Sequence, residues 1–249
     1  MIKENLNNLY KALPEGVKLV AVSKFHPVER LMEAYDAGQR IFGENRPQEL
    51  AAKVPQMPKD VQWHFIGHLQ TNKLKLVLPY VDLVQSVDSL HLLETIRKWA
   101  VENGRIVNVL LELHLGAEQT KHGLTEEEII LALESSEGTP SENVRFADPS
   151  HKWAPPSHEP RVAQFSEGVP SEDSGVRIVG LMGMATNTDD MSVVEKDFER
   201  IEKLFRKLQE SYPQLTELSI GMSGDWPLAV KHSATMVRIG TDIFGPREY

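Results

Sequence analysis

The sequence predicts a single (β/α)8 barrel, an α/β fold in which eight parallel strands alternate with helices around one core. Three observations support this prediction. The chain has 249 residues, close to the ~250 that are typical of this fold. Its composition, 41% hydrophobic and 25% charged, is that of a globular domain and excludes wholesale disorder. Short apolar runs also alternate with stretches of helical spacing, which is the pattern of parallel strands joined by crossover helices.

Eight strand-like runs follow one another along the chain. They are Lys18–Lys24, Arg40–Asn45, Trp63–His68, Leu83–Asp88, Val107–Leu115, Ile178–Ala185, Glu217–Ser223 and Met236–Thr241. A leading helix, with Leu6, Leu9 and Leu13 on one face, comes before the first strand. The helices between strands are Val28–Ala37, Pro47–Val54, Asn72–Leu78, Leu90–Glu102, Glu126–Glu134, Val193–Ser211 and Pro227–Ser233. This count matches a barrel, and an open doubly wound sheet is the alternative.

The most regular helix carries apolar residues three and four positions apart, so that they form one stripe that can pack on the sheet. They are Val194, Phe198, Ile201, Leu204, Phe205 and Leu208. Ser192 with Glu195 predicts a capping box at the start of this helix, and Thr125 with Glu128 predicts one for an earlier helix.

One segment does not fit the alternation. Residues 136–175 contain six of the fifteen prolines and seven serines, with seven acidic and three basic side chains and no sustained period. We interpret Ser136–Gly175 as a flexible loop insertion between a helix and a strand, where a barrel tolerates insertions. The remainder is expected to form a single domain over residues 1–249.

The net charge restricts the partners of the chain. Lys and Arg number 27 against 36 Asp and Glu, a net charge of −9, which repels phosphate backbones and anionic lipid headgroups. We therefore expect no binding to nucleic acid or membranes. The chain contains no Cys, which excludes disulfides, thiolate catalysis and Cys-based metal sites. No run approaches the ~18 apolar residues of a membrane span, and two charges precede the first apolar run, so we expect a cytoplasmic protein.

Lys24 is the first candidate for chemistry. It ends the run Val20-Ala21-Val22-Ser23-Lys24, and strand alternation puts Val20, Val22 and Lys24 on the face that points into a barrel. An amine at the mouth, above an apolar strand, loses solvation of its charged form, so that its pKa falls and it becomes nucleophilic toward aldehydes. A Schiff base is the natural use of such a lysine. A lysine that ends a strand and reaches water is the alternative.

A candidate phosphate site lies near the C-terminus. Arg238 and Gly240 share a strand face, and Gly240 lets the backbone approach a ligand where a Cβ would obstruct it. The N–H groups of Gly240 and Thr241 would hold a phosphate after strands seven and eight, where barrels often bind one. Ser223, at the end of strand seven, offers a hydroxyl to the same region. A Gly-rich rim with a surface arginine is the alternative.

Other polar residues lie at the ends of strands two, three and five. Gly43-Glu44-Asn45 closes strand two, at the rim where barrels carry their active sites. His64 and His68 have a metal-ligand spacing for a helix, but they lie in a predicted strand and no third ligand is apparent. We therefore expect no metal site. Lys121 puts another amine on the rim, although a solvated loop also accounts for it.

In their order and spacing, these motifs resemble the pyridoxal-phosphate homeostasis proteins (YggS/PROSC-like), a family related in fold to the N-terminal barrel domain of alanine racemase. The resemblance covers nearly the whole chain apart from the insertion. It rests on Val20–Lys24, Gly43–Asn45, Trp63–Lys73, Ser86–Leu90, Lys121–Gly123, Gly180–Met182, Leu218–Trp226 and Val237–Gly245.

The resemblance implies a function in intracellular pyridoxal 5′-phosphate homeostasis, with the cofactor held as an internal aldimine, or Schiff base, on Lys24. It further implies that Ser223, Gly240 and Thr241 hold the phosphate and that Arg238 faces the pyridine nitrogen. It places Asn45 in the same pocket.

Because the related fold belongs to a racemase, amino-acid racemisation is a candidate activity. Two-base racemisation needs a second acid/base, which racemases take from an additional C-terminal domain, and we expect none because the chain ends at Tyr249. Arg238 cannot readily donate a proton, which leaves the ring nitrogen unprotonated and the electron sink weak. We therefore expect a monomeric carrier without catalytic residues, in transient contact with apo forms of pyridoxal-phosphate enzymes. An amino-acid racemase and a cofactor-independent Schiff-base aldolase remain as alternatives.

Overall fold

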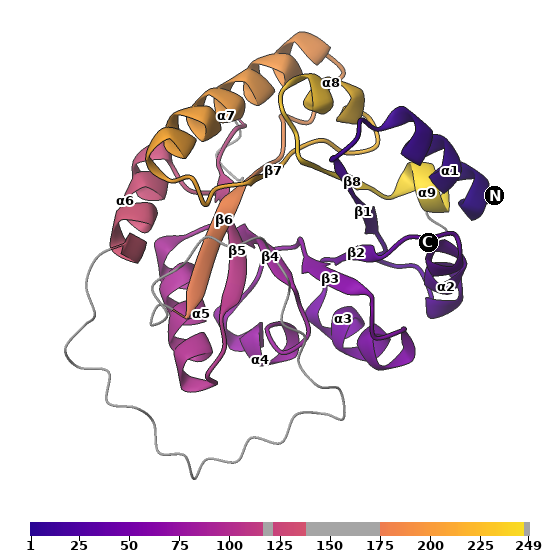
Figure 1. The fold of residues 1–249 in the computed structure, drawn as a ribbon, viewed down its shortest axis with the longest axis horizontal. Coiled ribbons are helices and arrows are strands. Elements are labelled where there is room, and N and C mark those ends of the chain that lie inside the picture. The colour runs from indigo at the N-terminus through magenta and orange to yellow at the C-terminus, as the bar shows by residue number, and fades with distance from the viewer. Residues whose placement is uncertain (117–121, 138–174, 247–249) are drawn as a thin grey trace.

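The eight strands form one closed parallel barrel in which each strand pairs with its neighbours in sequence and β8 closes on β1 (Figure 1). The computed structural model describes residues 1–116, 122–137 and 175–246. The strands are β1 Lys18–Val22, β2 Ile41–Glu44, β3 Gln62–Phe65, β4 Leu83–Val87, β5 Val107–Leu113, β6 Val176–Gly183, β7 Glu217–Ser219 and β8 Met236–Ile239. The predicted fold class is confirmed.

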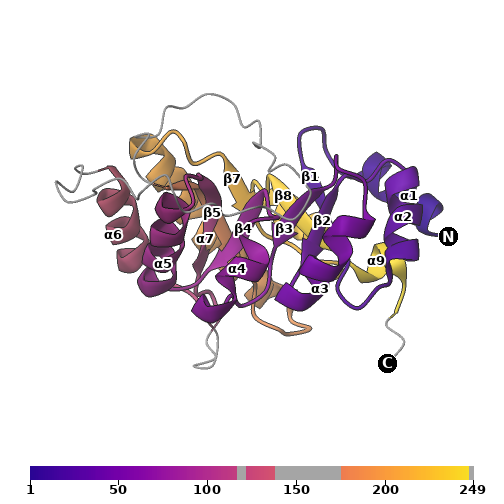
Figure 2. The ribbon, with the colours of Figure 1, turned by 90° about the horizontal axis from the view of Figure 1, so that it is seen from below.

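The helices surround the barrel, as the views along and across it show (Figures 1 and 2). They are α1 Ile2–Ala12, α2 Val28–Asp36, α3 Pro47–Lys53, α4 Leu74–Val77, α5 Leu90–Glu102, α6 Glu126–Glu137, α7 Met191–Ser211, α8 Trp226–Lys231 and α9 Thr241–Phe244. Short 3-10 turns, Val54–Gln56 and Thr71–Lys73, follow α3 and precede α4. The leading helix α1 contacts α9, because Asn5 Nδ2 donates to the carbonyl of Ile243 at 3.0 Å.

The strands end earlier than the apolar runs predict. β1 stops at Val22 and β7 at Ser219, so that Lys24 and Ser223 lie beyond their strands. Thr241, predicted at the end of a strand, is the first residue of α9. The reason is that the polar residues at the carboxyl ends leave the sheet and enter the connections to the next helices. Of the predicted insertion Ser136–Gly175, the structure describes only the ends, where α6 extends to Glu137 and Gly175 precedes β6.

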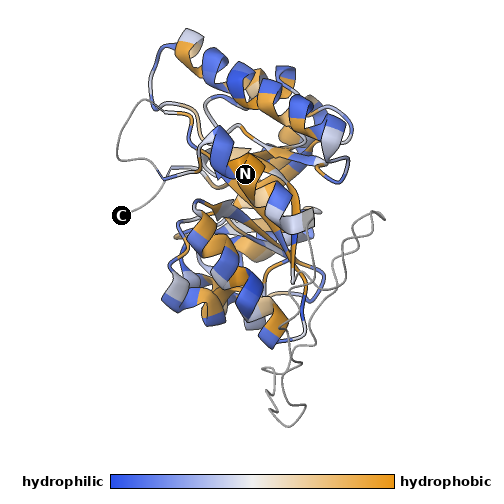
Figure 3. Cartoon of the chain, turned by 90° about the vertical axis from the view of Figure 1, so that its left-hand side faces the viewer, coloured by the Kyte–Doolittle hydropathy of each residue, from blue (hydrophilic) through white to orange (hydrophobic). Residues whose placement is uncertain are grey.

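The apolar core has two layers. Six side chains fill the inside of the barrel: Val20, Leu83, Leu110, Val179, Met182 and Met236. A larger cluster lies between the strands and the surrounding helices. It contains the whole predicted stripe of α7, from Val194 to Leu208. This stripe is visible in Figure 3, where hydrophobic and hydrophilic residues alternate along α7, the long helix at the top of the view.

One of the two predicted capping boxes is present. The Thr125 N–H donates to Glu128 Oε2 at 2.9 Å, and the Glu128 N–H donates to Thr125 Oγ1 at 3.2 Å. The prediction for Ser192 and Glu195 is wrong. Asp190 is the N-cap of α7, and its carboxylate accepts from the Ser192 N–H at 2.9 Å. The helix begins one residue before Ser192, and a carboxylate satisfies its first N–H groups as well as a hydroxyl does.

Among the described residues, no helix combines the length and the hydropathy that crossing a membrane requires.

Gly180 tests the contact between β6 and β7. A Cβ at this position would lie 1.7 Å from the carbonyl oxygen of Glu217, its partner in the parallel ladder. Gly180→Ala must therefore separate the two strands, and we expect the free energy of unfolding in urea to fall by about 1–3 kcal/mol or more. Gly224→Ala is the matched control, because no heavy atom lies within 4 Å of the added carbon. Equal stability of the two variants would contradict this account.

Candidate functional site

The closing strand pair brings the two ends of the chain together at the carboxyl rim of the barrel. Val20 of β1 pairs with Arg238 of β8, and Ala21 pairs with Ile239. Lys24 follows β1 by two residues and Gly240 follows β8 by one. A Cβ on Gly240 would lie 3.3 Å from both the Cβ and the carbonyl oxygen of Val22. Lys24 and the glycine of the predicted phosphate site therefore belong to one part of the rim.

A buried ion-pair network holds the turn that carries Lys24. The Lys53 ammonium, from α3, donates to the Ser23 carbonyl at 2.9 Å, to Glu44 Oε1 at 2.7 Å and to Glu49 Oε2 at 3.2 Å. All three of its N–H donors are thus used. Ser23 Oγ donates to Glu44 at 2.7 Å. Burial raises the pKa of Glu44 even though Lys53 stabilises its carboxylate.

The next residue is constrained as well. Phe25 has a φ of +68°, a left-handed conformation that is uncommon for a residue with a Cβ. Its N–H donates to Glu49 Oε2 at 2.9 Å, and the Arg46 guanidinium lies over its ring at 4.4 Å. The same α3 helix therefore fixes the residues on both sides of Lys24.

Our sequence analysis did not identify Lys53. A signal was present, because Leu50, Lys53 and Val54 have the spacing of one helix face and Leu50 and Val54 are buried apolar residues. A lysine within an apolar stripe indicates a buried cation with acidic partners.

The predicted phosphate-binding residues lie around the start of α9. Gly240 is the N-cap of this short helix and Thr241, which is exposed, is its first residue. Burial raises the pKa of Asp242, which lies next to Thr241 in α9, and the nearby Ser223 hydroxyl lowers it, so the β7–α8 connection reaches this helix. His26, two residues after Lys24, stacks on Phe244 with ring centroids 4.6 Å apart. Lys24, Ser223, Gly240 and Thr241 are thus carried by segments that contact one another.

Arg238 lies inside the barrel and not at its surface. Its guanidinium donates to the Ser219 carbonyl at 2.8 Å, to Ser219 Oγ at 2.6 Å and to the Gly183 carbonyl at 2.9 Å. Burial lowers the pKa of Arg238 to about 10, opposed by the charges of Glu112 and Asp225. The side chain therefore keeps its proton at neutral pH. The alternative of a surface arginine is wrong.

The hydrogen bonds continue across the barrel from Ser219. Its hydroxyl donates to Gln85 Oε1 at 2.7 Å, and Gln85 Nε2 donates to His64 Nδ1 at 2.8 Å. Burial lowers the pKa of His64 to about 3, so the ring is neutral and accepts this bond. His64 is thus a buried interior residue, and His68 is not part of this network.

Asn45 lies at the end of β2, beside the rim. Its backbone and Cβ pack against Gly67, where an added Cβ would lie 2.4–2.7 Å from Asn45 atoms. Among the described residues, none provides a hydrogen-bond partner for its buried Oδ1 atom. An unsatisfied buried acceptor is costly, and a donor on a bound ligand would satisfy it.

A pocket of about 180 Å³ opens on the other side of the rim. It is lined by Ile66, His68, Glu112, Leu113, Leu115, His122 and Met184. Lys24, Asn45 and the predicted phosphate-binding residues are absent from this lining. Our sequence analysis did not identify Glu112. Its carboxyl group interacts with the charge of Asp88 on this side of the rim and with the charge of Arg238 inside the barrel. Lys121 lies outside the described residues.

The protonation of Glu112 provides a pH test of this geometry. Burial and the charge of Asp88 raise the pKa of Glu112 from 4.5 to about 7, although Arg238 lowers it. Between these two pH values the folded protein holds a proton that the unfolded chain has released, so the free energy of unfolding falls as pH rises through this window. Glu112→Gln, which does not titrate, should escape this loss.

Between pH 5 and pH 8 the free energy of unfolding of the variant should rise, relative to that of wild type, by on the order of 2–3 kcal/mol. Urea unfolding of both proteins at the two pH values measures the change. Parallel pH dependence of the two proteins would contradict the raised pKa.

Comparisons with known proteins agree with the fold and with the motifs. The family model "Alanine racemase, N-terminal domain" matches residues 1–146 and 161–248. The pyridoxal phosphate homeostasis protein of Vibrio alginolyticus is 32% identical over 241 residues, which cover 95% of this chain and 89% of that protein. The protein of the same name from Schizosaccharomyces pombe is 35% identical over 239 residues, covering 93% and 85%.

Solved structures agree as well. PipY of Synechococcus elongatus PCC7942, solved with PLP bound, has 34% sequence identity and a TM-score of 0.78, with coverage of 98% of this chain and 100% of PipY. Alanine racemase of E. faecalis shares the fold, with a TM-score of 0.66 and 18% identity, and its match covers 99% of this chain and 58% of the racemase. The predicted family is therefore confirmed: this chain belongs to the pyridoxal phosphate homeostasis proteins, whose barrel is that of the alanine racemase N-terminal domain.

Proposed function

We propose that this chain binds pyridoxal 5′-phosphate at the β1–β8 side of the rim, linked to the Lys24 amine as a Schiff base, and that it stores and delivers the coenzyme. The observation that carries the proposal is the closing strand pair, which joins a rim lysine to a glycine and a helix start suited to phosphate. PipY, 34% identical, is a relative with PLP bound. From the family resemblance we further propose a monomeric, cytoplasmic carrier that contacts apo-enzymes transiently.

The residues present fit this coenzyme. Asn45 offers a side-chain amide whose buried Oδ1 lacks a partner among the described residues, and the NH2 group of this amide can donate to an oxygen of the coenzyme. Gly240, which lies against Val22, keeps a side chain out of the space beside the helix start. When bound, pyridoxal 5′-phosphate supplies an aldehyde that condenses with amines and a ring that withdraws electrons.

The residues around the rim have distinct roles in this proposal. Lys24 provides the amine, and the Lys53 network holds its turn in place. Thr241 and the backbone at Gly240 bind the phosphate, together with the Ser223 hydroxyl. Arg238 orients the ring from inside the barrel.

The same arginine supports a carrier over a racemase. With a pKa of about 10, Arg238 is a cation at neutral pH, and its guanidinium cannot accept a hydrogen bond from a protonated ring nitrogen. A ring nitrogen that faces a guanidinium stays unprotonated, which weakens the electron withdrawal that racemisation requires. We therefore propose storage and delivery over amino-acid turnover.

Lys24→Ala should abolish covalent attachment of the coenzyme while the barrel stays folded, since Lys24 lies beyond the last hydrogen-bonded residue of β1. The measurement is borohydride reduction of the loaded protein followed by peptide mapping of the pyridoxyl group. Lys203→Ala, an exposed lysine on α7, is the control and should keep full labelling. A pyridoxyl group found mainly on another lysine of the wild-type protein would overturn the assignment.

The double variant Ser223→Ala/Thr241→Ala should weaken the binding of pyridoxal 5′-phosphate much more than the binding of pyridoxal, which lacks the phosphate. Each hydrogen bond to a charged group contributes about 1.5–3 kcal/mol. Equilibrium titration with both ligands measures the two losses. Thr216→Ala, an exposed threonine before β7, is the control. Equal losses for the two ligands would show that these hydroxyls do not hold the phosphate.

The carrier function is tested by two assays on the loaded protein. Incubated with L-alanine, it should interconvert the enantiomers far more slowly than a racemase, because one positioned base typically contributes 10²–10⁴-fold. Incubated with an apo-enzyme that requires pyridoxal 5′-phosphate, it should restore activity faster than spontaneous release of the coenzyme allows. Rapid racemisation would establish the alternative function, and activation no faster than release would reduce the role to storage.

A further inference from the structure

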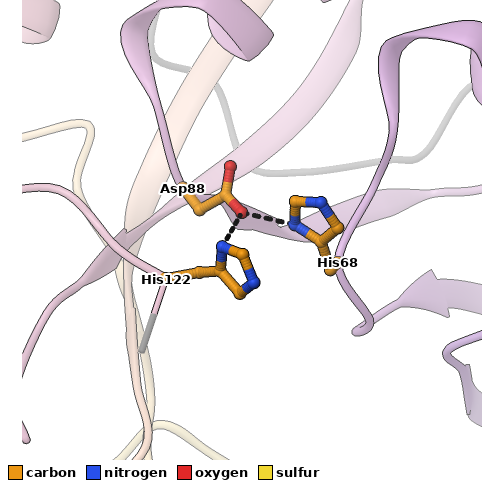
Figure 4. A group of neighbouring side chains, drawn as sticks. All are labelled: His68, Asp88 and His122. Carbon is orange, nitrogen blue, oxygen red and sulfur yellow. Dashed lines mark hydrogen bonds and ion pairs between the residues drawn. The ribbon is translucent and has the colours of Figure 1, made fainter. Parts of the chain in front are cut away.

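Three side chains from three different segments meet at the edge of the 180 Å³ pocket (Figure 4). His68 follows β3, Asp88 immediately follows β4, and His122 lies in the connection from β5 to α6. One potential ligand atom from each side chain lies within 4.8 Å of the other two. These segments are remote in sequence, so the barrel itself creates the cluster.

The two rings present the same nitrogen to the same oxygen. His68 Nδ1 lies 2.7 Å from Asp88 Oδ2, and His122 Nδ1 lies 3.8 Å from that atom. The rings stack with centroids 4.3 Å apart and an interplanar angle of 20°. Ligand atoms of one tetrahedral ion, each bonded at 2.0–2.2 Å, lie about 3.3 Å apart. The two observed separations fall on either side of this value. Because an imidazole nitrogen binds a metal in the plane of its ring, one of the two exposed rings must rotate out of the stack to complete the coordination.

The donor types select a class of metal. Two imidazole nitrogens and one carboxylate suit Zn²⁺ and its neighbours Co²⁺ and Ni²⁺, whereas Mg²⁺ and Ca²⁺ prefer all-oxygen ligands. The Asp88 side chain is 6% exposed, while those of His68 and His122 are 46% and 62% exposed. The carboxylate is thus anchored in the rim and the imidazoles are accessible to an ion from solvent.

The surroundings favour a cation. Glu112, a buried carboxyl group, lines the same pocket. The other lining residues are mostly apolar: Ile66, Leu113, Leu115 and Met184. At about 180 Å³ the pocket is smaller than the ~300 Å³ at which ordinary small-molecule sites begin, but it has room for an ion and its waters.

We propose that His68, Asp88 and His122 form a binding site for a divalent transition-metal ion, Zn²⁺ or a close neighbour, with the remaining coordination position open to the pocket. Three protein ligands and an open position are the arrangement of accessible zinc sites. The expectation of no metal site rested on the lack of a third ligand for His64 and His68. The structure gives His68 different partners, which come from other strands.

A bound ion would link the ends of β3 and β4 to the connection after β5. This part of the rim lies apart from Lys24, and the proposal does not depend on coenzyme binding. Metal binding by Lys24→Ala, equal to that of wild type, would establish this independence.

The test is a Co²⁺ titration of the untagged full-length chain after dialysis against a chelator, followed by the visible absorption that Co²⁺ develops in a site of low coordination number. We expect one Co²⁺ per chain, displaced by Zn²⁺, which favours four-coordinate sites with imidazole and carboxylate ligands. His68→Ala and His122→Ala should each weaken binding at least about tenfold, since loss of even an outer-shell partner has an effect of that size. Asp88→Asn should do the same.

His91→Ala is the matched control, because His91 is an exposed histidine on the neighbouring helix α5 that is not part of the cluster. This variant should bind Co²⁺ like wild type. Circular dichroism checks that each variant is folded, and Zn²⁺ should raise the Tm of wild type but not of the His68→Ala/His122→Ala double variant. Absence of the cobalt absorption in wild type, or equal binding by the double variant, would overturn the proposal.

Discussion

The pairing of β1 with β8 is the constraint on which the rest of this structure depends. It joins residues near the two ends of the chain, Val20 with Arg238 and Ala21 with Ile239. Without it the strands would form an open sheet, and Lys24 would lie at one edge with Gly240 at the other. Closure also removes both sheet edges, so that every strand is paired on both sides. The stability of the fold and the composition of the rim therefore have the same origin.

The inside of the barrel holds apolar and polar side chains together. Leu83, Leu110 and Met236 belong to its apolar cluster. Beside them, hydrogen bonds connect Arg238 through Ser219 and Gln85 to His64. Buried polar groups are tolerated only when they are paired. This network provides the pairing and leaves a cation beneath the rim, where a ligand can meet it.

A second buried network holds the turn of Lys24. Removing one partner of a buried ion pair typically costs 3–5 kcal/mol, whereas an apolar replacement of the whole pair is often neutral. The Glu44–Lys53 pair is therefore weak evidence for stability. Its geometry is more informative, because Lys53 binds the Ser23 carbonyl and Glu49 binds the Phe25 N–H. The network fixes backbone on both sides of Lys24, and we interpret it as a device that positions this residue.

Local patterns in the sequence were sufficient for much of this protein. The alternation of strands and helices, the stripe of α7 and the capping box of Thr125 with Glu128 depend on residues within one or two turns of each other. Lys24 and Gly240 could be proposed as site residues because strand alternation and the absence of a Cβ are also local properties. The family motifs added the coenzyme, since their order along the chain is specific.

Only the tertiary structure decided which distant side chains meet. Lys53 pairs with acidic residues and Arg238 lies inside the barrel. His68 lies beside Asp88 and His122 and not beside His64. Each of these contacts depends on strand register and on the path of a connection, which no local periodicity encodes. The sequence by itself therefore determined the elements, their order and the candidate residues of the coenzyme site. Barrel closure decided their neighbours, because it brings the carboxyl ends of all eight strands to one rim.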